Sequence, residues 1–224
     1  MRQHLIIAAV ALTAALSQPA RAQSLVQYPF TTSTSAATTA AGVQSSIDAS
    51  QLGVSHGGSG FYIGDDGYGN VVEAYPNGGS TSASAALTNN SYFTVALQGL
   101  GSNTFNVNGL QFDVGKGGRS SPRGLFIRSS TDGFASDIFS QILGAGQASP
   151  TTTSVALSGT QYQNLSSVGF RVYVYTPDPV LNSVDFRDFR VNGNVTTTPE
   201  PSSMALLGTG LIGLVPMIRR KRKR

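Results

Sequence analysis

Short runs in which every second residue is apolar recur between residues 25 and 191. The clearest are residues 92–97 and 168–175. A repeat of two places alternate side chains on opposite faces of a strand, so that one face can be buried. Turn-forming Gly, Asn and Asp residues separate the runs. The pattern therefore predicts about ten short strands and an all-β fold.

Two Asn-Gly pairs, at 108–109 and 192–193, interrupt the alternation. Asn-Gly suits a tight turn between paired strands, because both residues tolerate positive φ. We expect the first pair to form a hairpin turn and the second to end the domain. Phe186 and Phe189 lie three positions apart within residues 184–191, which breaks the alternation and predicts a bulge.

One internal segment, residues 134–143, has helical spacing, because Phe134, Ile138 and Ile142 recur every four residues. Side chains four positions apart share one face of a helix, so the segment predicts a single short helix. The other segments are short strands joined by turns, and no second domain boundary is visible. They predict a β-sandwich of jelly-roll type over residues 23–197.

The N-terminus has the three parts of a secretory signal peptide. Arg2 supplies the positive start, residues 5–16 are apolar, and Ala20 and Ala22 give the small-x-small cleavage pattern. A retained anchor is the alternative, but 12 apolar residues are too short to cross about 30 Å of hydrocarbon as a helix. We expect residues 1–22 to be removed by signal peptidase after Ala22.

The C-terminus combines an apolar run with a basic end. Residues 202–218 carry no charge, and the six residues from 219 to 224 are all basic. As a helix the run would span about 25 Å, which is nearly enough for a bilayer core. Basic residues beside a membrane span stay cytoplasmic, which places residues 23–198 outside. The sequence thus predicts one C-terminal transmembrane helix.

The net charge of the chain differs in sign from that of the domain without its two ends. The chain has 15 Lys and Arg, 11 Asp and Glu, and a net charge of +4. Residues 23–198 hold seven of the basic and ten of the acidic side chains, so their net charge is −3. A basic patch for nucleic acid is therefore not expected in the domain. The absence of Cys excludes disulfides and thiolate metal sites within this sequence.

The tail resembles a known sorting signal. Pro199, Glu200 and Pro201, then the apolar run and the basic end, resemble the PEP-CTERM family over residues 198–224, although Thr198 stands where the family often has Val. The resemblance implies export and a transient stay in the inner membrane. It also implies recognition and cleavage near the motif by a membrane-embedded exosortase, with delivery to the surface of a bacterium that makes exopolysaccharide. An ordinary anchor after a Pro-rich linker is the alternative.

Residues 53–57 match the G-x-S-x-G pattern of a hydrolase nucleophile. That chemistry needs a separate His base later in the chain, but the only His outside the pattern is His4, in the predicted signal peptide. We therefore interpret residues 53–57 as a Gly-rich loop.

Two carboxylates would suffice for glycoside hydrolysis. Glu73 is the only Glu between residues 23 and 198, which excludes a pair of Glu residues there. The Asp candidates lie in contexts typical of turns or solvated strand faces, and they are Asp113, Asp132, Asp137, Asp185 and Asp188. We expect no enzymatic activity.

Asp65, Asp66 and Asn70 lie close together in a Gly-rich loop near Glu73. Carboxylate and amide oxygens are ligands that Ca²⁺ prefers, so these residues are candidates for a structural calcium site. Their spacing does not match an EF-hand. A protein without Cys and with so few His is not expected to hold catalytic zinc, and no other cofactor is indicated.

Several tyrosines fall on predicted outer strand faces or in turns, where rings could stack on sugars. They are Tyr62, Tyr68, Tyr75, Tyr173 and Tyr175. Together the observations predict an exported, non-enzymatic β-sandwich at the cell surface or in the extracellular matrix. We expect a structural or adhesive role in association with exopolysaccharide. The alternatives are a carbohydrate-binding module and, third, a polysaccharide-active enzyme.

Overall fold

The computed structural model describes most of the predicted domain. The residues described are 23–35, 38–55, 58–116, 122–144, 146–179 and 181–196. The predicted signal peptide and its cleavage site, the sorting motif and the tail lie outside them. Within these ranges, no helix has the length and apolar character needed to cross a membrane.

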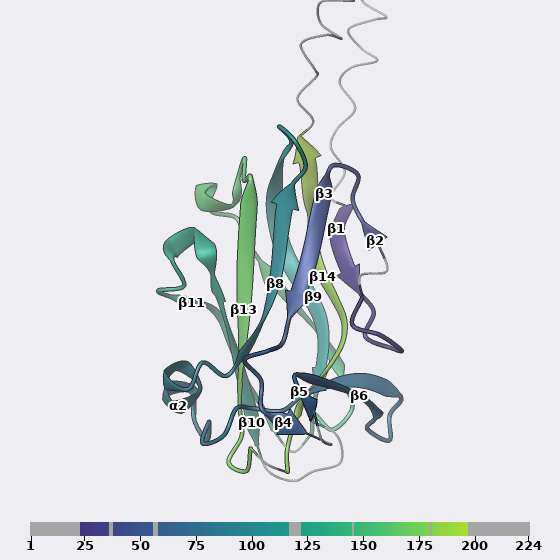
Figure 1. The fold of residues 1–224 in the computed structure, drawn as a ribbon, viewed down its shortest axis with the longest axis vertical. Helices are drawn as coiled ribbons and strands as arrows, with labels where there is room; N and C mark the ends of the chain where they lie inside the picture. The colour runs from purple at the N-terminus through teal and green to yellow at the C-terminus, as the bar shows by residue number, and fades with distance from the viewer. Residues whose placement is uncertain are drawn as a thin grey trace, which may run out of the picture.

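Two antiparallel sheets face each other and form a β-sandwich (Figure 1). The seven-stranded sheet has the order β12 (Thr151–Ala156), β9 (Thr104–Gly115), β14 (Val184–Thr196), β1 (Gln23–Tyr28) and β2 (Thr38–Thr39), and β7 (Asn70–Ala74) and β6 (Phe61–Asp65) extend it from β14. The five-stranded sheet has the order β11 (Asp137–Leu143), β10 (Arg123–Ser129), β13 (Ser167–Tyr175), β8 (Tyr92–Gly99) and β3 (Val43–Asp48). The short elements are β4 (Val54–Ser55), β5 (Gly58–Ser59), α2 (Ala83–Thr88), η1 (Ser130–Asp132) and η2 (Thr160–Tyr162).

The chain passes repeatedly from one sheet to the other. β8 lies in the five-stranded sheet, and β9 joins the seven-stranded sheet. β10 and β11 return to the five-stranded sheet. β12 and β14 then lie in the seven-stranded sheet, with β13 between them along the chain in the five-stranded sheet. The last strand, β14, pairs with the first, β1, and places Gln23 opposite Gly193. The two ends of the described domain therefore lie side by side, and the chain leaves the sandwich at one end (Figure 1). The predicted all-β sandwich is confirmed.

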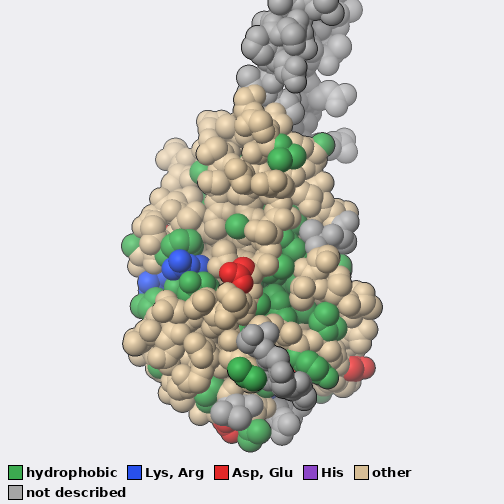
Figure 2. Space-filling model, in the orientation of Figure 1, with side chains coloured by type: hydrophobic (Ala, Val, Ile, Leu, Met, Phe, Trp, Pro, Cys, Tyr) green, Lys and Arg blue, Asp and Glu red, His purple; other side chains and the backbone are tan. Residues whose placement is uncertain are grey.

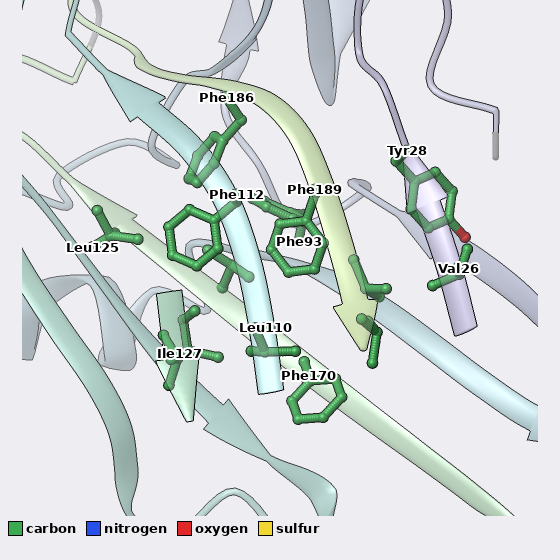
Figure 3. Close-up of a cluster of buried hydrophobic side chains, with 14 of the residues drawn as sticks. Val26, Tyr28, Phe93, Leu110, Phe112, Leu125, Ile127, Phe170, Phe186 and Phe189 are labelled. Carbon is green, nitrogen blue, oxygen red and sulfur yellow. The ribbon is translucent and has the colours of Figure 1, made fainter. Parts of the chain in front are cut away.

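One hydrophobic core fills the space between the sheets. Phe93, Val95 and Leu97 are the buried side chains of β8, as the alternation predicts. The ring of Phe93 meets those of Phe186 and Phe189 on the opposite sheet, with centroids 5.2 and 6.2 Å apart (Figure 3). Edge-on aromatic contacts of this kind join the two sheets near the centre of the sandwich.

The predicted bulge in β14 is present. Its register against β9 shifts between Arg187 and Arg190, and Asp188 has a φ of 51°. The extra residue changes which face the following side chains occupy. Both Phe186 and Phe189 therefore point into the core, and both are fully buried.

Both predictions for the Asn-Gly pairs are wrong, since the first pair forms no hairpin turn and the second does not end the domain. Both lie inside continuous strands, β9 and β14, and face each other where the register shifts between Asn192 and Gly193. A Cβ on Gly109 would lie 2.6 Å from the carbonyl oxygen of Val155, and one on Gly193 would clash with the carbonyl of Asn106. Glycine is needed at both places because neighbouring backbones approach closely, not because the chain turns.

The predicted helix over residues 134–143 is also wrong. Residues 137–143 form β11, which pairs with β10 along its length. Phe134 precedes the strand with a φ of 63°, which is not a helical conformation. A spacing of four among three apolar residues did not outweigh the hydrogen bonds that a neighbouring strand offers.

A helix forms instead at α2, where the sequence has no apolar repeat. Ser82 caps it, since its hydroxyl oxygen accepts a hydrogen bond from the backbone N–H of Ala85 at 3.2 Å. Ala86 is fully buried against Phe126 and Tyr173 on the five-stranded sheet. Tertiary packing thus stabilises a helix of six residues that would not persist alone.

Candidate functional site

The candidate site lies on the face of the five-stranded sheet that points away from the core. The strand register places its outward side chains in rows across β3, β8, β13 and β10. The first row lies near the end where the chain leaves the sandwich (Figure 1). In order from that end, the rows are Gln44, Gln98 and Ser167; Ser46, Ala96 and Gly169; Asp48, Thr94, Arg171 and Arg128; and Tyr92, Tyr173 and Phe126.

The aromatic row, which consists of Tyr92, Tyr173 and Phe126, is covered and contributes to packing. The ring of Tyr173 stacks on that of Phe126, with centroids 4.5 Å apart, and lies 4.9 Å from that of Tyr92. Ala86 of α2 packs against this row, and Tyr173 is only 2% exposed. The row therefore fixes α2 on the sheet and leaves little surface for a ligand.

The predicted platform of exposed tyrosines is wrong for two of its members. Tyr75 is buried, and its hydroxyl donates to Oε2 of Glu73 at 2.6 Å. Tyr173 lies under α2. Tyr62 and Tyr68 are exposed, but they lie on and just after β6, in the other sheet from Tyr173 and Tyr175. The five tyrosines do not form one surface.

Two arginines are held in place in the charged row, which consists of Asp48, Thr94, Arg171 and Arg128. The guanidinium carbon of Arg171 lies 3.9 Å from the ring centroid of Phe134 and 4.6 Å from that of Tyr92. Arg128 pairs with Asp137 at 2.6 Å and donates to the backbone carbonyl of Phe134. Figure 2 shows basic side chains among hydrophobic ones on this face. Cation–π contacts and the ion pair restrict both guanidinium groups.

A shallow groove of about 600 Å³ lies on the first two rows. None of its lining residues has an ionisable side chain. At one end of the groove, Nε2 of Gln44 donates to Oε1 of Gln98 at 2.9 Å. At its other side, the backbone N–H of Gly169 donates to the hydroxyl oxygen of Ser130 at 2.9 Å. The groove can therefore bind an uncharged polar ligand by hydrogen bonds.

No local pattern in the sequence predicts this groove. Its lining comes from β3, β8, β13 and η1, which are far apart along the chain. The one available sign was Gly169, a glycine inside the strongest strand pattern, since such a glycine often marks a place where something approaches closely.

The carboxyl group of Asp185 is buried, which corrects the predicted turn or solvated strand face. Asp185 is 2% exposed, because its strand pairs there with both β7 and β9. The hydroxyl of Ser183 donates to Oδ1 of Asp185 at 2.5 Å. The guanidinium of Arg123 donates to the carbonyl of Ser183 and to Oδ1 of Asn182. Burial raises the pKa of Asp185 from 3.8 to about 7, against the opposing effects of Ser183 and Arg123.

This pKa predicts a pH-dependent stability. The folded protein keeps a proton on Asp185 that the unfolded chain releases, so the free energy of unfolding falls as the pH rises from about 4 to about 7. The Asp185→Asn variant keeps the acceptor for Ser183 but cannot ionise. We expect it to be more stable than the wild type above pH 7, by up to about 4 kcal/mol at 1.4 kcal/mol per pKa unit.

Urea unfolding of both proteins at pH 4.5 and pH 8 measures this difference. The stability gap between variant and wild type must widen at the higher pH. A gap that is equal at the two pH values would contradict the raised pKa.

The other four carboxylate candidates make local or cross-strand contacts. Asp137 pairs with Arg128, and Asp188 pairs with Arg190 at 2.5 Å. Asp113 accepts a hydrogen bond from Thr152 Oγ1 at 2.7 Å. The carboxylate of Asp132 accepts the backbone N–H groups of residues 135 and 136 after η1. Each therefore holds a turn or joins neighbouring strands.

The calcium candidates lie in and beside the turn between β6 and β7. Asp65 accepts two backbone N–H groups of this turn, and Asp66 accepts one. Asn70 begins β7, and its carbonyl accepts from Nε of Arg187. In the part of the chain that the structure describes, no group of three or more His, Cys, Asp or Glu side chains could hold a metal ion. Calcium binding stays a prediction.

Gly53, in the G-x-S-x-G pattern, lies against the backbone of residues 75 and 76. Its N–H donates to the carbonyl of Tyr75 at 2.8 Å, and a Cβ would clash with the carbonyl of Pro76. Glycine is therefore needed at position 53 because the neighbouring backbone leaves no room for a side chain. His56 and Gly57 lie outside the described residues.

Comparison with known proteins bears on the tail. The family model of the PEP-CTERM protein-sorting motif matches residues 197–223. A comparison of the chain with curated proteins found no match. The matched segment contains the Pro-Glu-Pro tripeptide, the apolar run and nearly all of the basic end. This chain therefore carries a PEP-CTERM sorting motif, which marks it as an exported protein that an exosortase-type membrane enzyme sorts to the cell surface or beyond.

Proposed function

We propose that this protein is a structural or adhesive component of the cell surface or extracellular matrix, where it associates with exopolysaccharide. One observation carries the proposal: an exported sandwich presents a broad sheet face with a groove of uncharged amide and hydroxyl groups. Such groups both donate to and accept from sugar hydroxyls. The domain has a net charge of −3, which would repel an acidic polymer. A groove without ionisable side chains therefore fits a neutral polymer better.

The protein acts without catalysis. In support, the five Asp candidates hold turns, strand pairs or a buried hydrogen bond. The groove lining has no ionisable side chain to act as general acid or base. A matrix protein needs neither, because its task is to bind and space polymers.

We assign the sandwich to the jelly-roll type. If β1 and β8 to β14 are numbered 1 to 8, the two sheets run 6-3-8-1 and 5-4-7-2. A chain that winds between two four-stranded sheets in this order forms two Greek keys. The strands β2, β3, β6 and β7 add to this eight-stranded arrangement.

The chain reaches the surface in two steps. Signal peptidase removes residues 1–22 after export begins, and the run at 202–218 holds the protein in the inner membrane for a time. Processing at the motif then releases the sandwich. The sandwich stays tethered through the end of its last strand, β14, while the tail is still attached.

Fractionation of cells tests the association with exopolysaccharide. In the producing bacterium, an internally tagged full chain should be recovered with the matrix. In a mutant that makes no exopolysaccharide, it should appear in the medium instead. An unchanged distribution between the two strains would rule out the association.

A carbohydrate-binding module is the second candidate, and the groove is the observation that favours it. For a module, recognition of a glycan at this groove would be the whole task, whereas a structural protein uses the same contact to hold the matrix together. A polysaccharide-active enzyme is the third. It would lower the viscosity of purified exopolysaccharide or create new reducing ends, and we expect neither.

A further inference from the structure

We propose that the groove on the five-stranded sheet is a binding site for a neutral polysaccharide chain. This inference rests on the proposed function and deepens it, because it assigns the contact with polysaccharide to one site and one class of glycan. Three features of the groove support it: a low floor, a polar rim and an apolar ring at one side.

The floor is low because its central residues are small. Ser46, Ala96 and Gly169 lie side by side on β3, β8 and β13. A Cβ on Gly169 would find no atom closer than 3.7 Å, so packing does not require glycine there. A β-branched residue would suit the strand better. Glycine at 169 therefore leaves open a space that a side chain could occupy, and a ligand can approach the sheet closely.

The rim offers hydrogen-bonding groups of both kinds. The bond between Gln44 and Gln98 uses one N–H of Gln44 and the carbonyl oxygen of Gln98. The side-chain carbonyl oxygen of Gln44 can then accept from a sugar hydroxyl, and the side-chain amide N–H groups of Gln98 can donate to one. Both side chains are exposed. The hydroxyl of Ser130 accepts from Gly169, so its own proton is available for donation.

An aromatic ring borders the floor. The edge of Phe134 lies 3.7 Å from the position of a Cβ on Gly169, and Arg171 holds the ring by a cation–π contact. The faces of sugar rings carry C–H groups that pack against aromatic surfaces. A fixed ring beside an open floor therefore provides the apolar half of a sugar site.

The charges favour a neutral glycan. The groove lining contains no ionisable side chain. The nearby cations are engaged, since Arg128 pairs with Asp137 and Arg171 lies between two rings. An acidic polymer would find no unshielded cation in the groove, and the net charge of the domain would oppose it.

Affinity electrophoresis of the full chain in detergent tests the site. The probes are the neutral polysaccharide fraction of the producing bacterium, a galactomannan, a soluble β-glucan and alginate as the acidic polymer. We expect retardation by at least one neutral polymer and none by alginate. Gly169→Val and Ala96→Val fill the floor, and each should weaken binding about tenfold or more, as loss of close contact with a sugar unit predicts. Gln98→Leu removes part of the rim without filling the floor, and it should weaken binding as well.

Gly146→Val is the matched control, because it makes the same substitution where a Cβ would meet nothing within 4 Å. It should bind like the wild type. Far-ultraviolet circular dichroism and thermal unfolding check that each variant is folded. The site assignment is overturned if no neutral polymer binds, if alginate binds best, or if all three folded groove variants bind as the wild type does. If the wild type still fractionates with exopolysaccharide in those cases, the proposed function stands without this site.

Discussion

A full chain in which Pro199, Glu200 and Pro201 are all replaced by alanine is expected to accumulate in the membrane at full length. We expect the exosortase-type enzyme to recognise the tail through this motif, and the apolar run at 202–218 and the basic end to stop transfer without it. The variant should therefore lose recognition and keep its anchor. Immunoblotting of membrane, surface and medium fractions, with mass spectrometry of the C-terminus, measures the outcome.

The chain offers a matched control in the loop after β13. Pro177, Asp178 and Pro179 form a second tripeptide of proline, acid and proline, far from the tail. Replacing these three residues by alanine should leave sorting and processing unchanged. Release of a processed tail variant at the wild-type level would show that the motif does not direct sorting.

Replacing Phe93 by alanine is expected to lower the free energy of unfolding by about 3–5 kcal/mol. Phe93 is fully buried, and its ring meets those of Phe186 and Phe189 at centroid distances of 5.2 and 6.2 Å (Figure 3). It also meets the ring of Phe61 at 4.9 Å. Its loss leaves a cavity between the two sheets that neighbouring strands cannot close. The effect is large against the total stability of about 5–15 kcal/mol that domains possess.

Urea unfolding followed by far-ultraviolet circular dichroism measures the change, since the chain has no Trp for fluorescence. Phe93→Leu keeps most of the volume and should cost clearly less than the change to alanine. Ile142→Ala removes a side chain that is 68% exposed and should change stability by no more than about 0.5 kcal/mol. Equal losses in Phe93→Ala and Ile142→Ala would mean that Phe93 does not join the sheets as described.

The sequence determined the features that depend on neighbouring residues alone. Alternation predicted the buried faces of β8 and β13, because the period of a strand is a local property. The spacing of Phe186 and Phe189 predicted the bulge in β14 for the same reason. The sorting motif was also readable, since an enzyme recognises it as a short linear segment.

Features that depend on a distant partner became visible only in the folded structure. Residues 137–143 became a strand because β10 was available to pair with them, and α2 formed because Phe126 and Tyr173 offered a surface. The Asn-Gly pairs stayed inside strands because backbones from other strands lie against their glycines.

The groove, too, exists only after folding. Its floor joins three strands that the chain reaches at residues 46, 96 and 169, and its chemistry comes from the register between them. Burial of Asp185 likewise requires β7 and β9 on either side of β14. Local sequence patterns set which way each strand faces, but the pairing of distant strands decides which side chains meet.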